Sequence, residues 1–191
     1  WLGLVRILAG FGSAALAGYT IAIRVAIFAL LPSFGFANAA ATLVGQNLGA
    51  GRPERAERSV WTAAFYNFVF LGTVSVAFVT LPGPIVRFFS SDPAVIAFGV
   101  DCLRIVALGF LFYAYGFVVA QAFNGAGDTT TPMLLNFFCF WLFKIPAAYL
   151  LAVTAGLGPR GVFISITAAY STLAVAGGVL FRRGRWKNRK V

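Results

Sequence analysis

The sequence predicts an all-α integral membrane protein, and three observations support this prediction. Of the 191 residues, 60% are hydrophobic and only 10% are charged, whereas soluble domains carry about 25% charged residues. The mean hydropathy of +0.88 agrees with this bias. The apolar residues are gathered into long runs, and a helix needs about 20 such residues to cross the hydrocarbon core of a bilayer.

Five apolar runs are predicted to cross the membrane, and short breaks rich in Gly, Pro, Ser, Asp or Arg separate them. Strands of a membrane barrel would be about 10 residues long with alternating polarity, and these runs are longer and do not alternate. Asp92-Pro93 and Thr131-Pro132 are typical of capped helix starts. The predicted spans are 14–45, 58–81, 95–122, 133–153 and 161–181, with 1–9 as the end of a further span. Together they form a single transmembrane lobe over 1–191.

Positive charge predicts the orientation of the spans. Arginines gather in the break at 46–58, and a basic tail follows at 182–191. Four spans separate these two regions, so both lie on one side, and cytoplasmic loops are the ones enriched in Lys and Arg. We therefore expect a multi-pass protein of the plasma membrane with a cytoplasmic C-terminus. Trp186 is expected to anchor the tail at the lipid interface.

Several classes of function are disfavoured by the composition. The net charge is +10, but the cations lie between apolar runs and form no basic stripe of the kind that binds nucleic acid. Histidine is absent, acidic residues number five, and both cysteines lie inside apolar runs. No nucleophile–base set or metal-ligand cluster is recognisable. We expect neither an enzyme nor a metal or cofactor protein, and membrane lipid is an expected partner.

Two cations lie deep in predicted spans. Lys144 is near the centre of the fourth run, and Arg24 is midway along the first. A charged residue at the bilayer centre costs about 3 kcal/mol on insertion scales, so it normally faces a cavity or a partner. Both residues are therefore candidates to line a substrate or ion cavity. A structural ion pair or a side chain that snorkels to the interface is the alternative.

Three further polar residues on the third run are candidates for the same cavity. Asp101 is spaced for an i,i+3 ion pair with Arg104, and an ion-coupling role is the alternative. Tyr113 could line a pocket or pack between helices. Gln121 could contact a substrate or hydrogen-bond between helices, as polar side chains in membranes commonly do.

Two breaks have a distinct composition. One contains Gly45-Gln46-Asn47-Leu48-Gly49, and the other reads Gly125-Ala126-Gly127-Asp128-Thr129-Thr130-Thr131-Pro132. Glycines allow sharp reversals and end helices, while Asp and Thr cap the helix that follows. Side chains of Gln46 and Asn47 can bond backbone groups that the turn leaves free. The structural residues of these loops are Gly45, Gln46, Gly49, Gly125, Gly127, Asp128 and Pro132.

Both breaks resemble cytoplasmic loops of the MATE (multidrug and toxic compound extrusion) transporters. Three further segments, 14–17, 88–93 and 156–162, are similar to the family pattern in the same order, and 183–187 is also typical of the family. The resemblance implies a twelve-helix, two-lobe fold built from parallel repeats, with this chain as the six-helix second lobe and an N-terminal lobe as its missing partner. It also implies an antiporter that exports cationic or amphipathic small molecules in exchange for H⁺ or Na⁺.

The chain departs from the family at one position. Some members carry an acidic residue about fifteen positions before the Asp of the second loop, where this sequence has Tyr113. A coupling carboxylate is therefore expected in the missing lobe, or else at Asp101. Two rival functions stay open at the level of sequence. One is a flippase for lipid-linked glycans with a related fold, which needs a strongly cationic cavity, and the other is a non-transporting membrane scaffold.

Overall fold

The computed structural model describes residues 2–188, and this part of the chain contains helices and turns but no strand. Trp1 and the last three residues of the predicted basic tail, Arg189, Lys190 and Val191, lie outside the described residues. The elements are α1 (Leu2–Ala9), α2 (Ser13–Gly49), α3 (Pro53–Thr80), α4 (Pro82–Arg87), α5 (Pro93–Gly125), α6 (Thr130–Phe137), the π-helical η1 (Phe138–Phe143), α7 (Lys144–Tyr149), the π-helical η2 (Leu150–Thr154), α8 (Pro159–Arg182) and the 3-10 helix η3 (Arg185–Asn188).

Five helical segments of the described chain are long and apolar enough to cross a membrane. They are α2, α3, α5, α8 and the unbroken run from α6 to η2 (Thr130–Thr154). Each overlaps one of the apolar ranges from which the sequence predicted a span, and α1 lies over the range 1–9. The all-α membrane fold is thereby confirmed.

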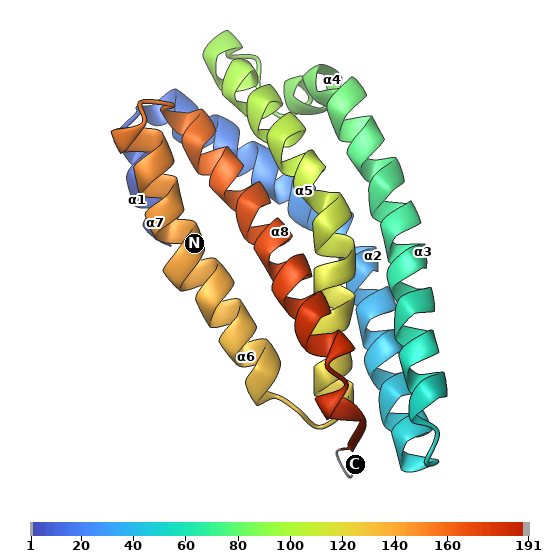
Figure 1. Ribbon diagram of the computed structural model, residues 1–191. Helices are drawn as coiled ribbons and strands as arrows, with labels where there is room; N and C mark the ends of the chain where they lie inside the picture. The colour runs from blue at the N-terminus through green and yellow to red at the C-terminus, as the bar shows by residue number, and fades with distance from the viewer. Residues whose placement is uncertain (1, 189–191) are drawn as a thin grey trace.

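Helix α5 is the central element of the lobe. It packs against α2, α3 and α8, whereas the run from α6 to η2 lies at the edge, beside α8 and α1 (Figure 1). Three side chains from the neighbours donate hydrogen bonds to backbone carbonyls of α5. The donors are Asn67 Nδ2, Ser75 Oγ and Thr167 Oγ1, which lie 3.0, 2.8 and 2.7 Å from their acceptors. Such bonds add directional contacts where the apolar driving force is weak.

The structure confirms one of two predicted helix caps and contradicts the other. Asp92 Oδ1 accepts a 2.8 Å hydrogen bond from the N–H of Ala94 and caps α5 as predicted. The prediction that Thr131 caps the fourth span is wrong, because α6 already begins at Thr130. Asp128, the other residue predicted to cap this helix, has this role: its carboxylate accepts from the N–H and the hydroxyl of Thr131 at 3.2 and 2.7 Å.

The described part of the basic tail, residues 182–188, does not extend freely from α8. Trp186 is 1% exposed, stacks on Phe181 with centroids 4.6 Å apart, and donates from Nε1 to the Phe181 carbonyl. Its expected role as an anchor at the lipid interface is therefore wrong, because the chain turns back after α8 and buries the indole within the lobe. The next residue, Lys187, pairs with Glu57 of α3.

Candidate functional site

Lys144 lies in the run from α6 to η2, the peripheral span, at the point where the helix returns from π-helical to α-helical pitch. Its backbone N–H bonds to the carbonyl of Cys139, five residues earlier, at the end of η1. Pro146 explains this local geometry, because it has no N–H for the carbonyl of Leu142 and its ring crowds that carbonyl. A π-helical turn relieves the crowding, and such turns are frequent at functional sites. Lys144 is half-buried, and its Nζ lies 4.8 Å from the ring centroid of Phe140.

A continuous series of ring contacts runs from Lys144 across the lobe. We call it the aromatic row, and it consists of Phe140, Tyr170, Tyr113, Phe117 and Phe34. Successive centroids are 6.2, 4.8, 5.0 and 4.8 Å apart. The distances fall within the range of favourable aromatic pairs. The row thus joins the peripheral span to α8, α5 and α2 in turn.

Close approach of α5 and α8 holds the two tyrosines of the row together. A Cβ atom on Gly109 would lie 2.9 Å from Tyr170 Cδ2, and one on Gly116 would lie 2.9 Å from the backbone nitrogen of Ala174. The two glycines are seven residues apart, so they share one face of α5. Tyr113 lies between them in sequence and is only 9% exposed. Its hydroxyl-bearing ring is therefore part of the packed interior of the lobe.

The structure brings together only two of the five predicted cavity residues. Lys144 and Tyr113 are joined through the aromatic row. Arg24 is exposed on α2 and forms no ion pair within residues 2–188. Gln121 accepts a 2.8 Å hydrogen bond from Asn124, one turn further along α5, at the end that carries the second loop. The roles of these residues in a cavity stay predictions.

Asp101 differs from its expected pairing. The predicted ion pair with Arg104 does not form. Instead Asp101 Oδ2 lies 2.8 Å from Arg160 Nε, in the first turn of α8, and Arg104 Nε donates to the Val79 carbonyl at 3.4 Å. The packing of α8 against α5 brings a second guanidinium within reach, which the spacing along one helix could not reveal. Asp101 thus links two spans near one end of the lobe.

The two glycine-rich loops meet in space. A Cβ atom on Gly125 would lie 2.1 Å from the carbonyl oxygen of Ala41, and one on Gly45 would lie 3.2 Å from the carbonyl oxygen of Gly125. Only glycine fits so close a backbone contact between α2 and α5. Gly127 has φ of +74°, a left-handed conformation that favours glycine. The loops therefore close the same end of the lobe, next to the basic tail (Figure 1).

The other loop residues have local roles. Asn47 Nδ2 donates to the Leu43 carbonyl at 2.7 Å, so this side chain bonds the backbone one turn earlier in α2 and not, as the sequence predicted, the turn itself. Gln46 contributes its carbonyl, which accepts from the N–H of Ala50. Gly49 is the last residue of α2, and Pro132 is buried in the first turn of α6.

Most residues of the aromatic row were missed by sequence reasoning. Phe140, Phe117 and Phe34 are three of 21 phenylalanines, and their spacing does not indicate which rings meet. Tyr170 could have been singled out from the sequence, because a polar hydroxyl inside an apolar run is unusual and therefore a candidate for a specific role. Within residues 2–188 no group of three His, Cys, Asp or Glu side chains could hold a metal ion.

Comparison with known proteins identifies relatives along nearly the whole chain. The MatE family model matches residues 3–150. A probable multidrug resistance protein NorM of Thermotoga maritima is 30% identical over 180 residues, which cover 94% of this chain and 39% of the relative. The chain spans about 40% of the length of the curated relatives it matches.

Solved structures share the fold of the lobe. An outward-facing multidrug resistance MATE family transporter matches with a TM-score of 0.89 and 21% identity, over 97% of this chain and 42% of that protein. An inward-facing transporter of the same description matches with a TM-score of 0.87 and 20% identity, over 99% of this chain and 44% of that protein. The helical arrangement described above is therefore present in both conformations of such transporters.

Proposed function

The chain belongs to the MatE family, and we propose that the complete protein is a secondary active efflux transporter of the plasma membrane, with its C-terminus in the cytoplasm. It exports cationic or amphipathic small molecules in exchange for H⁺ or Na⁺. The observation that carries this proposal is the family match over residues 3–150, together with relatives named as multidrug resistance proteins. Those names do not favour a glycan flippase or a scaffold.

Alternating access is supported by the similar likeness to outward-facing and inward-facing structures. The TM-scores of 0.89 and 0.87 differ little, as expected if the lobe moves as a rigid body against another part of the protein. The close backbone contact at Gly125 and the buried bonds from Asn67 and Ser75 to α5 would resist distortion within the lobe.

The aromatic row suggests what this lobe contributes to substrate binding. Phe34 is its one exposed ring, and Lys144 stands at its other end, half-buried. Aromatic faces attract organic cations and pack against flat apolar groups. Lys144 repels a cationic group, so it would orient an amphipathic substrate with its uncharged part toward this side of the lobe.

Ion coupling is assigned mainly to the part of the protein outside this chain. The acidic residues of the chain lie near helix ends or loops: Glu54, Glu57, Asp92, Asp101 and Asp128. Tyr113, the position where some family members carry an acid, is packed in the aromatic row. Asp101 is the alternative coupling group, and its pairing with Arg160 would have to open during the cycle.

Efflux is tested by expressing the complete polypeptide in a drug-sensitive strain and measuring the accumulation of cationic dyes. We expect lower accumulation than in cells without the protein, and the effect should collapse when the H⁺ and Na⁺ gradients are dissipated. Unchanged accumulation across a broad dye panel, with the protein confirmed in the membrane, would contradict the proposal.

The role of Lys144 is tested by comparing Lys144→Ala with Arg87→Ala. Arg87 is an exposed cation in the last turn of α4, so the control removes the same charge at a helix end. We expect the Lys144 variant to change dye export or its substrate preference more than the control does. Equal activity at equal expression would remove Lys144 from the site.

A further inference from the structure

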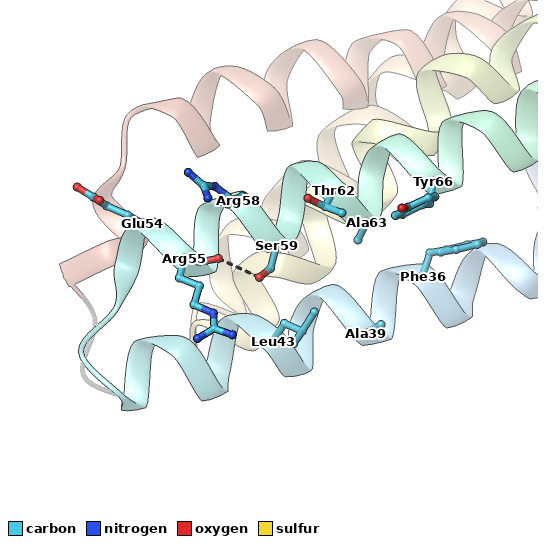
Figure 2. A pocket seen from close by; sticks show the side chains of 10 residues that line it. All are labelled: Phe36, Ala39, Leu43, Glu54, Arg55, Arg58, Ser59, Thr62, Ala63 and Tyr66. Carbon is cyan, nitrogen blue, oxygen red and sulfur yellow. Dashed lines mark hydrogen bonds between the residues drawn. The ribbon is translucent and has the colours of Figure 1, made fainter.

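A groove of about 660 Å³ lies between α2 and α3, beside the turn that joins them (Figure 2). One wall is formed by α2, and its lining residues Phe36, Ala39 and Leu43 follow helical spacing. The other wall is formed by one face of α3, from Arg55 through Ser59 and Thr62 to Tyr66. None of these residues belongs to the aromatic row.

The groove is polarised along its length. Arg55 lies near the start of α3, and the apolar and aromatic residues lie further into the spans. Eleven residues separate Arg55 from Tyr66, which corresponds to about 17 Å at 1.5 Å per residue. Phe36 lies level with Tyr66 on the opposite wall (Figure 2). The cationic end of the groove is complementary to the head group of an anionic phospholipid, and its apolar part is complementary to an acyl chain.

Positive charge at the open end is not neutralised. Arg55 and Arg58 form no ion pair within residues 2–188, and Glu57, the acid beside Arg58, pairs with Lys187 from the tail. Glu54 and Arg58 also lie at the rim, with their charged groups pointing away from α2, whereas the Arg55 guanidinium lies beside α2 (Figure 2). Thr62 also lines the groove, and its hydroxyl can donate a hydrogen bond. The end of the groove is therefore complementary to an anion.

We propose that the α2–α3 groove binds an anionic phospholipid of the cytoplasmic leaflet. The phosphate lies beside the Arg55 guanidinium, Arg58 reaches it by a change of its side-chain rotamer, and one acyl chain lies along Phe36, Leu43 and Tyr66. The predicted orientation places this end at the cytoplasmic surface, where anionic lipids gather, and basic pockets between membrane helices bind their head groups. The lipid would fix the junction between α2 and α3 at the level of the head groups.

The test uses the complete polypeptide, purified and stripped of lipid, in a native mass spectrometry titration. Phosphatidylglycerol and phosphatidylcholine with identical acyl chains are compared. We expect tighter binding of phosphatidylglycerol, and the double variant Arg55→Gln/Arg58→Gln should weaken it about 25-fold, since each arginine near a membrane surface contributes about a factor of five. The variant Leu43→Trp should also weaken binding, because Leu43 is 39% exposed in the groove and the indole would fill it without changing charge.

A matched control is Arg182→Gln/Arg183→Gln. It removes two exposed arginines at the same end of the lobe that do not line the groove, so phosphatidylglycerol should bind as in the unaltered protein. Equal affinity for the two lipids, or an equal loss in the control, would overturn the proposal. Displacement of the lipid by millimolar inorganic phosphate would assign the site to free phosphate and overturn it as well. The measurement needs no transport activity, so it is independent of the proposed efflux function.

Discussion

Gly125 offers the sharpest test of how the lobe is packed. A Cβ atom there would lie 2.1 Å from the carbonyl oxygen of Ala41 and 2.7 Å from two further backbone atoms of that residue. Because Cβ atoms essentially never come closer than 3.0 Å to a heavy atom, Gly125→Ala must move α2 away from α5. No flexible side chain can absorb this shift, since the atoms in the way are backbone.

The expected cost follows from the general size of overpacking effects. Extra methyl groups forced into packed interiors cost about 1–3 kcal/mol, and a backbone clash belongs at the upper end. Alanine regains up to about 1 kcal/mol of helix propensity, and less at Gly125 because it ends its helix. We therefore expect a net destabilisation of about 2 kcal/mol. Gly178→Ala is the matched control, because nothing lies within 4 Å of its Cβ position in α8, and it should stabilise by about 0.5–1 kcal/mol.

The two buried cysteines provide the assay. Cys102 and Cys139 are both 0% exposed, so a thiol-reactive fluorescent dye labels them only when the lobe opens. Thermal unfolding of the purified complete polypeptide, with any cysteine outside this chain replaced by serine, should therefore report this region. The two variants should differ by about 3 kcal/mol, which corresponds to roughly 6–12 °C for a unit of this size. A Gly125→Ala protein that melts at or above the Gly178→Ala protein would refute the argument from close helix contact.

Two further substitutions test buried contacts by the same dye assay. Asn67→Ala should destabilise the lobe by about 1–2 kcal/mol, because the amide donates a hydrogen bond to the Ala114 carbonyl inside the lobe. The control Thr73→Ala should change the stability little, since its exposed hydroxyl bonds only within its own helix. Trp186→Ala should cost about 3 kcal/mol by removing a buried indole. The control Trp141→Ala removes an indole that is 65% exposed, and a similar loss in both tryptophan variants would argue against a packed tail.

The fold could be predicted from the sequence because membrane spanning depends on properties that lie along the chain. The length of an apolar run decides whether a helix can cross, and a local motif such as Asp92-Pro93 decides where it begins. The fold class and the cap at Asp92 therefore agree with the structure.

Contacts between spans could not be predicted in the same way. The partner of Asp101 proved to be Arg160, 59 residues away, because the packing of α8 against α5 determines which guanidinium is near. The aromatic row depends on the same packing, and spacing within one helix carries no information about it. Trp186 was misplaced for a related reason: its burial requires the chain to turn back after α8, and a basic composition gives no sign of that turn.

The position of α5 also has a consequence for biosynthesis. Two of the helices that pack against it, α2 and α3, precede it in the chain, and the third, α8, follows after the peripheral span. As the chain leaves the ribosome, the first three long helices can associate while α8 is still being made. Lys187, which pairs with Glu57 from 130 residues earlier, is added only after all five spans. The docking of η3 against α3 therefore follows the synthesis of all five spans.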